Sequence, residues 1–397
     1  MCRHGALLPL AALIVVLVTA VPLAAQATRI RVGLVSPMSG PIGFLGEYMR
    51  NSAIVEVERL NREGGLLGRR IDLLVRDDEL RPDKSLEFVR EFIERDRVSL
   101  IIGPSFTTNA LAVKPLVTQA KVIHMLPTAS GPGVLDGAPY TFRLQESDQL
   151  RLQVLARWAA RKNFRRFGMV VINDATGQGM ARIMPEEVRR AGIEYVGHEF
   201  FRADDQDLTP QVLKVREAGA DVLMAGTGNS SHAARIALAV QKLGWKVQII
   251  GISGLQGVSY PQLAGDAVLG TVFVAAYQGW QAGVPFEKMP RRYAEHVRAV
   301  IDRFGTVDQA GVKTIKGAPM TGDCVVVWAE AVKRARSLEA EAVKAELERT
   351  NMPRTTTPSG NQLVLTPASH EAYQAGLLFF YKWVKRPDGL YAFVETR

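Results

Sequence analysis

The chain has 397 residues, enough for two domains that each bury a core of their own. A hydrophobic content of 47% with 22% charged residues excludes a disordered or low-complexity protein. The formal net charge is +9, but the basic residues fall into small groups with acids between them, which indicates solvated faces and excludes a nucleic-acid partner.

The N-terminal segment decides the expected compartment. Arg3 precedes an apolar run over residues 6–18, and the small-x-small sequence AQA occupies residues 25–27. We therefore predict a secretory signal peptide over residues 1–27, cleaved after Ala27, and a periplasmic mature protein. An uncleaved membrane anchor is the weaker alternative, because prolines interrupt the apolar stretch.

Cysteine and histidine spacing argues against cross-links and metal sites. Cys2 leaves with the signal peptide, so Cys324 has no partner for an internal disulfide bond and is expected to be a buried small hydrophobe. The six histidines are widely spaced and no nucleotide-binding motif is complete, so we expect no cofactor.

From residue 28 onward, strand-like and helix-like segments alternate, which predicts an α/β protein with mostly parallel sheets. In the first half we predict strands over residues 30–36, 71–76, 98–102, 121–126 and 140–143, and helices over 47–63, 82–95 and 108–120. In the second half we predict strands over 167–172, 195–200, 221–225, 247–250 and 268–274, and helices over 149–162, 177–191, 208–218 and 230–243. The remaining chain adds helices over 286–304, 320–336 and 339–349 and strands over 362–365, 377–384 and 390–394, with a hairpin turn at 387–389.

Small hydroxyl-bearing residues follow several of the predicted strands. The loops GPSFTT (103–108) and PTAS (127–130) come directly after two neighbouring strands. Ligands of open parallel sheets bind at the carboxyl ends of the strands, and free N–H groups at a helix start attract anions. These loops are therefore candidates for a site that receives a small polar or acidic molecule. The alternative, which remains open, is that they are ordinary turns in which Thr107 or Thr108 caps the following helix.

No catalytic constellation accompanies these loops. Gly226-Thr227-Gly228 is similar to the start of a dinucleotide fingerprint, but Ser231 stands where the third glycine is needed. No Gly-x-Ser-x-Gly elbow occurs, and the acids DDE at residues 77–79 are assigned to capping the helix that follows them. We therefore predict binding without chemistry, and not an enzyme.

The beginning of the mature chain carries a more specific signal. The run IRVGLVSPMSGPIGFLGEYMRNSAIVEVERLNREGGLLGRRIDLLVRDDE resembles the start of the type I periplasmic solute-binding proteins, in particular the branched-chain amino acid (leucine/isoleucine/valine) binding family of ABC importers. The resemblance continues through IIGPSFTTNA, MLPTAS, TGQGMA and GTVFVAAY and covers residues 28–397. It implies two α/β lobes, joined by three hinge crossovers, that close around a ligand. The implied lobes are residues 28–147 with 280–355 and residues 148–279 with 356–397.

The resemblance also implies ligand-binding residues in the first lobe. Thr107 matches the family's hydroxyl that holds the ligand carboxylate, and Ser105 is expected to add backbone contacts beside it. Thr128, Ala129 and Ser130 match the run whose amides and hydroxyl complete that carboxylate site. These matches imply an acid group on the ligand.

Other positions depart from the family pattern. Ser253 stands where amino acid binders carry the acid that takes the ligand's α-ammonium, Thr176 replaces a tyrosine, and Thr227 or Gly228 replaces another. Because a buried ammonium without an ionic partner is costly, a carboxylate without an amine fits better. The alternative is that another acid restores amino acid binding, and the candidates for it are Asp174 and Asp323.

Four apolar residues are candidates for a wall around an aromatic or branched acid: Phe44, Leu45, Phe106 and Tyr277. Leu45, or Phe44 one place earlier, replaces the aromatic residue usual in the first loop of the family. The alternative is that Phe106 and Tyr277 only pack against their neighbours.

Together these observations predict a monomeric periplasmic receptor that captures a small carboxylate by lobe closure and delivers it to an inner-membrane ABC permease. The alternatives are a receptor for branched-chain or other hydrophobic amino acids or amides, and a ligand-sensing receptor subunit. An exported enzyme is the least supported interpretation.

Overall fold

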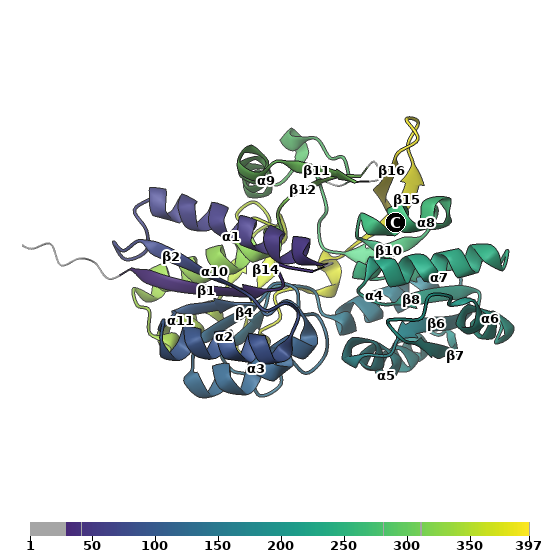
Figure 1. Cartoon of the computed structure of the whole chain (residues 1–397), viewed down its shortest axis with the longest axis horizontal. Coiled ribbons are helices and arrows are strands. Elements are labelled where there is room, and N and C mark those ends of the chain that lie inside the picture. Colours follow the sequence, from purple (N-terminus) through teal and green to yellow (C-terminus); the bar gives the residue numbers. More distant parts are fainter. Residues whose placement is uncertain (1–28, 41, 281, 310–311, 397) are drawn as a thin grey trace, which may run out of the picture.

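The computed structural model describes residues 29–40, 42–280, 282–309 and 312–396, which form two lobes, each built around its own sheet (Figure 1). The predicted signal peptide therefore lies outside the described residues. Within them, none of the helices is long and apolar enough to span a membrane. The predicted α/β class with mostly parallel sheets is confirmed by both sheets.

The first lobe contains a five-stranded parallel sheet in the order β2-β1-β3-β4-β5. Its strands are β1 (Ile30–Ser36), β2 (Ile71–Asp77), β3 (Leu100–Ile102), β4 (Ile123–Leu126) and β5 (Thr141–Arg143). Its helices are α1 (Gly43–Arg62), α2 (Pro82–Glu94), α3 (Thr107–Ala120), α9 (Arg291–Phe304), α10 (Pro319–Ala335) and α11 (Ala340–Leu347). Strands β3 and β4 are buried along their whole length, and only His124 in them is polar, because helices cover both faces of a parallel sheet.

The second lobe contains a seven-stranded sheet in the order β16-β15-β10-β9-β8-β6-β7. Its strands are β6 (Arg166–Ile172), β7 (Glu194–Phe201), β8 (Val222–Gly226), β9 (Gln248–Gly251), β10 (Val272–Ala275), β15 (Phe379–Lys385) and β16 (Tyr391–Thr396). Its helices are α4 (Asp148–Arg161), α5 (Ala175–Arg190), α6 (Thr209–Glu217), α7 (Ser230–Lys242) and α8 (Ser259–Ala264). Strands β15 and β16 form the predicted terminal hairpin and pair antiparallel, whereas β6 to β10 are parallel.

Short elements complete the chain and mark where prediction and structure differ. They are β11 (Thr306–Gln309), β12 (Val312–Ile315), β13 (Asn351–Met352), β14 (Leu363–Val364) and the 3-10 turns η1 (Ser253–Leu255), η2 (Gly265–Val268), η3 (Phe286–Lys288) and η4 (Ala375–Leu377). The predicted helix 286–304 is divided before Arg291, because Pro290 forces Met289 into an extended conformation with ψ 155°. The predicted strand 268–274 begins only at Val272, after Gly270 with φ +80°.

The core of the first lobe contains residues from late in the chain. Cys324 and Trp328 of α10 are fully buried among side chains of β1, β3 and α1, so the expectation of a buried cysteine is confirmed. Leu363 and Tyr373 belong to the same core, so the chain still packs in the first lobe at Tyr373. It enters the second sheet with β15.

Asp78 does not cap α2 as predicted. Its carboxylate accepts the Ser85 hydroxyl at 2.6 Å and the Asn109 amide at 3.3 Å and therefore links α2 to α3. The N-cap residue of α2 is Arg81, which makes no side-chain capping bond. The burial of Asp78 explains the difference, because a buried carboxylate takes the donors that the tertiary structure brings to it.

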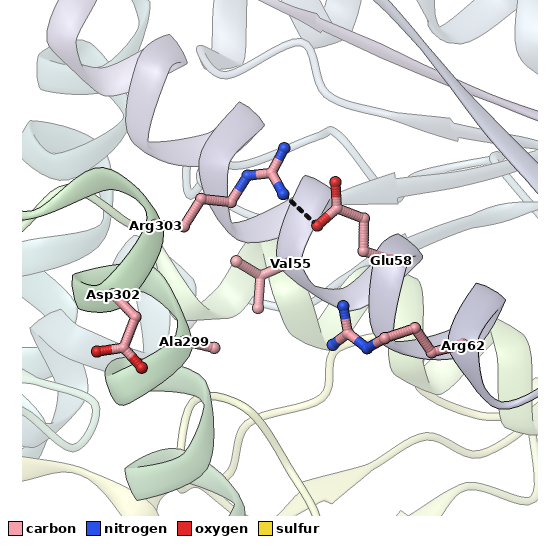
Figure 2. Close-up of a pocket in the computed structure, with 6 residues that line it drawn as sticks. All are labelled: Val55, Glu58, Arg62, Ala299, Asp302 and Arg303. Atoms are coloured by element: carbon pink, nitrogen blue, oxygen red, sulfur yellow. Dashed lines mark hydrogen bonds and ion pairs between the residues drawn. The ribbon is translucent and has the colours of Figure 1, made fainter.

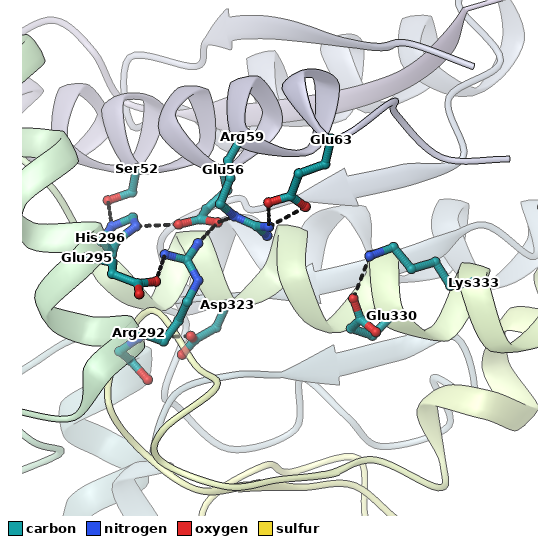
Figure 3. Close-up of polar contacts among 11 residues, drawn as sticks. Ser52, Glu56, Arg59, Glu63, Arg292, Glu295, His296, Asp323, Glu330 and Lys333 are labelled. Carbon is teal, nitrogen blue, oxygen red and sulfur yellow. Dashed lines mark hydrogen bonds and ion pairs between the residues drawn. The ribbon is translucent and has the colours of Figure 1, made fainter. Parts of the chain in front are cut away.

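A buried polar cluster holds α9 and α10 against α1 (Figure 3). Glu56 of α1 accepts hydrogen bonds from Arg59 at 3.0 Å and from Arg292 of α9, and pairs with Nδ1 of His296 at 2.6 Å. A Cβ on Gly322 of α10 would lie 3.0 Å from the His296 ring, so the absence of a side chain there allows the three helices to approach. We refer to Ser52, Glu56, Arg59, Arg292 and His296 as the α1–α9 cluster.

Candidate functional site

The carboxyl ends of the parallel strands of each sheet are directed toward the other lobe (Figure 1). The loops after β3 and β4 in the first lobe and after β6, β8 and β9 in the second carry most of the predicted ligand-binding residues. The two lobes touch between these loops, where Pro132 lies against Gly179 of α5. This is the position at which open parallel sheets bind ligands.

The loop after β3 is held in a conformation that only glycine adopts easily. Gly103 has φ +87°, and a Cβ there would overlap the carbonyl oxygen of Val35. Helix α3 begins soon afterwards at Thr107, with Phe106 at the N-cap position and no side-chain capping bond. The prediction that Thr107 or Thr108 caps this helix is therefore wrong. The hydroxyl of Thr107 instead accepts the N–H of Gly131 at 3.0 Å, from the loop after β4.

Two groups of backbone amides in the first lobe lack protein partners. Within the described part of the chain, the N–H groups of residues 106–108 and of residues 128–130 donate no hydrogen bond. Ala129 is only 1% exposed, so its amide is buried as well as unpaired. Buried N–H groups are normally satisfied, and those at a helix N-terminus attract negative charge. The structure therefore brings together an uncapped helix start and a second set of free donors suited to an anion.

The hydroxyl groups of this region have different capacities to donate. Because Thr107 Oγ1 accepts the Gly131 N–H, its own hydrogen stays free for an external acceptor. Thr128 donates its hydroxyl to the Ser105 carbonyl at 2.8 Å, which leaves it only as an acceptor. The Ser105 hydroxyl is buried 2.5 Å from that of Ser36, so Ser105 presents its backbone and not its side chain.

The apolar candidates divide into exposed and packed residues. Phe44 is 49% exposed and Phe106 is 38% exposed, and exposed aromatic rings are available to a ligand. Leu45 packs partly against the core of the first lobe. Tyr277 lies between the rings of Tyr293 and Phe379, with the Arg354 guanidinium 4.7 Å from its ring centre. For Tyr277 these contacts favour the packing interpretation.

The second-lobe candidates come together at the ends of β8 and β9. A Cβ on Gly228 would lie 3.6 Å from the Ser253 hydroxyl, so the two residues are neighbours. Thr227 is buried and accepts the Asn229 N–H at 3.1 Å. Thr176 lies in the first turn of α5, where it is half-buried.

The two acids considered as replacements for Ser253 have different surroundings. Asp174 is exposed at the N-cap of α5 and accepts the Gly177 N–H at 2.8 Å. Asp323 is fully buried inside the first lobe, accepts the Ser359 N–H at 3.0 Å, and has its pKa raised to about 8 by burial. Of the two, only Asp174 is open to an approaching ligand.

The charged residues next to the first-lobe loops have no clear signal in the sequence. Arg143 donates to the carbonyl oxygens of Ser130 at 3.1 Å and Gly131 at 2.9 Å, and forms an ion pair with Glu371 at 3.0 Å. Arg151 forms a buried ion pair with Glu146 at 3.0 Å in the first crossover. The only sequence signal is an arginine as the last residue of the predicted strand 140–143, and nothing in the sequence marks Glu371 as its partner.

A surface pocket elsewhere does not involve the predicted residues. It lies between α1 and α9, has a volume of about 230 Å³, and is lined by Val55, Glu58, Arg62, Ala299, Asp302 and Arg303 (Figure 2). Arg303 and Glu58 form an ion pair across it. Its charges are mixed and its own ion pair satisfies two of them, so the loops between the lobes remain the better candidate site.

Two α/β lobes whose facing loops offer unpaired amides and hydroxyls define a two-lobed solute-binding protein. A family model described as periplasmic binding protein matches residues 29–387, and the chain belongs to this family. The family implies a periplasmic location, and its members are substrate-binding proteins. The predicted family and the predicted role of a periplasmic binding protein are confirmed.

Three known proteins illustrate the similarity. The Leu/Ile/Val-binding protein homolog 3 of Brucella melitensis biotype 1 is 26% identical over 300 residues, which are 71% of this chain and 81% of that protein. The crystal structure of periplasmic binding protein type 1 from Bordetella pertussis Tohama I has a TM-score of 0.80 at 23% identity, over 91% of this chain and 98% of that one. A solute-binding protein of an ABC transporter from Rhodopseudomonas palustris BisB5, in complex with 3,4-dihydroxybenzoic acid, has a TM-score of 0.76 at 21% identity, over 93% and 96% of the chains. These similarities confirm the predicted fold.

Proposed function

We propose that this protein captures a small carboxylate without an α-amine and delivers it to an inner-membrane ABC permease. The observation that carries the proposal is the set of unpaired amides at residues 106–108 and 128–130 beside the free hydroxyl hydrogen of Thr107. Several N–H groups and one O–H directed at a carboxylate would satisfy it without a cationic side chain.

The second lobe supports a ligand without an ammonium group. Thr227, Gly228 and Ser253 occupy its facing loops, and none of them carries a negative charge. The exposed rings of Phe44 and Phe106 suit the body of an aromatic or branched acid. The Rhodopseudomonas palustris protein of the same fold, crystallised with 3,4-dihydroxybenzoic acid, is consistent with such a ligand.

Amino acid binding is the second candidate function, and one residue favours it. Asp174 is exposed at the start of α5 and would meet an ammonium on the second-lobe side. Several curated relatives are named for leucine, isoleucine and valine.

The proposal also includes export, a monomeric state and the bounds of the two lobes. A signal peptide over residues 1–27 is cleaved after Ala27, and the mature protein works as a monomer that performs no chemistry. The predicted division gives residues 28–147 and 280–355 to the first lobe and residues 148–279 and 356–397 to the second, and its last boundary has to be moved. Because Leu363 and Tyr373 pack in the first core, we place the third crossover between Tyr373 and β15.

A thermal-shift screen of the refolded, ligand-stripped mature protein tests the proposal. The probes are matched pairs: leucine with 4-methylpentanoate, phenylalanine with 3-phenylpropanoate, and 4-hydroxybenzamide with 4-hydroxybenzoate. A ligand at a hundredfold excess over its dissociation constant should stabilise the fold by about 2.7 kcal/mol. We expect the acids to raise the melting temperature and the amino acids to leave it unchanged. If leucine or phenylalanine gives the larger shift, the proposal is wrong and Asp174 becomes the acid that holds the ammonium.

A further inference from the structure

We propose that the segment 128–132, TASGP, which we call the capture loop, couples ligand capture to lobe closure. Arg143 is the positioning residue that holds this loop, and the contact of Pro132 with Gly179 is its link to the second lobe. The inference rests on the proposed function, because the same loop supplies the amides assigned to the ligand.

One peptide group of the capture loop is fixed from both sides. The carbonyl of Ser130 and the N–H of Gly131 belong to the same planar unit and point in opposite directions. Arg143 at 3.1 Å and the Asp148 N–H at 2.9 Å donate to the carbonyl, and the N–H donates to Thr107 at 3.0 Å. The orientation of this peptide group is therefore determined by β5, by the start of α4 and by α3 together.

The guanidinium of Arg143 reaches three groups at once. One of its nitrogens donates to the carbonyls of Ser130 and Gly131, and another pairs with Glu371, whose second oxygen accepts the Ser147 N–H at 2.9 Å. The Arg143 side chain is only 7% exposed. A lysine ammonium carries the same charge but lacks the planar fork that makes these contacts together. Arg143 thus connects the capture loop to the first crossover, where the lobes hinge.

The last residue of the capture loop touches the second lobe. A Cβ on Gly179 of α5 would lie 2.9 Å from Cγ and 3.0 Å from Cδ of Pro132. Helices α3 and α5 are also in contact here, across the boundary between the lobes. Glycine at position 179 therefore permits the approach, because any side chain there would hold α5 away from the capture loop.

These contacts place the ligand amides and the closure contact on one short segment. The amides of Ala129 and Ser130 are separated from Pro132 by no more than two residues, and Arg143 braces the peptide groups between them. A ligand that immobilises these amides therefore also immobilises Pro132, the residue of the capture loop that α5 contacts. The loop thereby provides a link between binding and closure that does not depend on a contact between α5 and the ligand.

Hydrogen exchange of the unliganded protein tests the role of Arg143. We compare Arg143→Lys with Arg157→Lys, an exposed residue of α4 for which the described chain provides no ion-pair partner. We expect the Gly131 amide to exchange about ten-fold faster or more in the Arg143 variant, since its local opening becomes easier, with no change in the control. Equal exchange rates of the Gly131 amide in both variants would overturn the proposal. The experiment requires no ligand.

Affinity measurements test the closure contact. We compare Gly179→Ala with Gln241→Ala, a substitution of an exposed residue of α7, and titrate each variant with 4-hydroxybenzoate, 4-methylpentanoate and leucine. If closure is impaired, every probe that binds should lose affinity by the same factor, about ten-fold or more, because the closed population falls. An unchanged affinity, or a loss that differs between probes, would contradict the link through Gly179.

Small-angle scattering separates this inference from the proposed function. If none of the probes binds the parent protein, the proposed ligand class fails, but the Gly179 contact can still be judged without ligand. We then expect Gly179→Ala to have a larger radius of gyration than the parent and Gln241→Ala to match the parent. Identical scattering of all three proteins would refute the contact as a determinant of closure.

Discussion

Nδ1 of His296 lies 2.6 Å from Oε1 of Glu56, and the other ring nitrogen lies 3.1 Å from the hydroxyl of Ser52. This order of serine, histidine and acid is the one that hydrolases use. All three side chains are completely buried between α1 and α9, however, so no substrate can reach the serine. The arrangement fastens α9 to the first lobe.

Glu56→Gln should destabilise the protein by about 3–5 kcal/mol near neutral pH, because it removes one partner from a buried ionic cluster. Burial alone would raise the pKa of Glu56, but the hydrogen bond and charge of His296, with Arg292 and Arg59, lower it to about 2. A lowered pKa means stability that is present above the unfolded value of 4.5 and is lost as the pH falls toward 2. Urea unfolding across this acid range should show a weaker pH dependence in the variant. Parallel curves would contradict the assignment.

For Asp323, the stability should depend on pH in the opposite direction, and Asp323→Asn tests this. Burial raises the pKa of Asp323 to about 8, so between the unfolded value of 3.8 and 8 the folded state keeps a proton that the unfolded state releases. The parent protein therefore loses stability from this group as the pH rises through that window. Asparagine can still accept the Ser359 N–H. We expect the variant to gain stability over the parent at pH 8 and to match it at pH 3, measured by melting temperature; the same difference at both values would refute the shift.

Thr107→Val should weaken the binding of carboxylates about 10- to 100-fold, the loss expected for a hydrogen bond to a charged group. Thr107→Ser keeps the hydroxyl and should retain most of the affinity. Thr108→Val removes an exposed hydroxyl one residue further along α3 and serves as the control. Isothermal titration with the best acid from the screen measures all three, and equal losses for Thr107→Val and Thr108→Val would argue against a ligand contact.

Ser253→Asp should move the preference from acids toward amino acids. It places a carboxylate beside Gly228 at the end of β9, on the side of the site where an ammonium is expected. An opposite charge at close range favours the ammonium and disfavours a second carboxylate. We expect the ratio of affinities for leucine and 4-methylpentanoate to shift by about ten-fold or more toward leucine. Ser253→Asn introduces a side chain of the same shape as aspartate but without its charge, and it should leave that ratio unchanged.

The alternation of apolar segments predicted the sheets well, because most of the parallel strands are short, largely apolar and bounded by turn residues. Strand β1 has the predicted bounds of Ile30–Ser36, and β2 exceeds its prediction by a single residue. Local sequence signals failed to predict two of the helices correctly. The helix over 286–304 is divided at Pro290, and helix α8 was missed because its six residues carry too little periodicity.

The candidate site was harder to predict, because tertiary contacts decide what each hydroxyl does. Threonine is a common helix-capping residue, but the side-chain oxygen of Thr107 accepts the N–H of Gly131, which lies 24 positions away in sequence. Arg143 and Glu371 are 228 positions apart, so no local pattern could pair them. A family resemblance predicted Thr128, Ala129 and Ser130 as ligand-binding residues. Only the three-dimensional structure shows which amides around them are unpaired.

The burial of Cys324 has a practical consequence. Burial raises the pKa of its thiol, and its sulfur lies inside the first core, so it is shielded from alkylating reagents. Cys2 lies in the predicted signal peptide, so a chain that begins at residue 28 carries no other cysteine and can accept one engineered thiol on each lobe. A pair of dyes attached there would report opening and closing directly. The fold thus comes ready to be converted into a fluorescent sensor for whichever solute it carries.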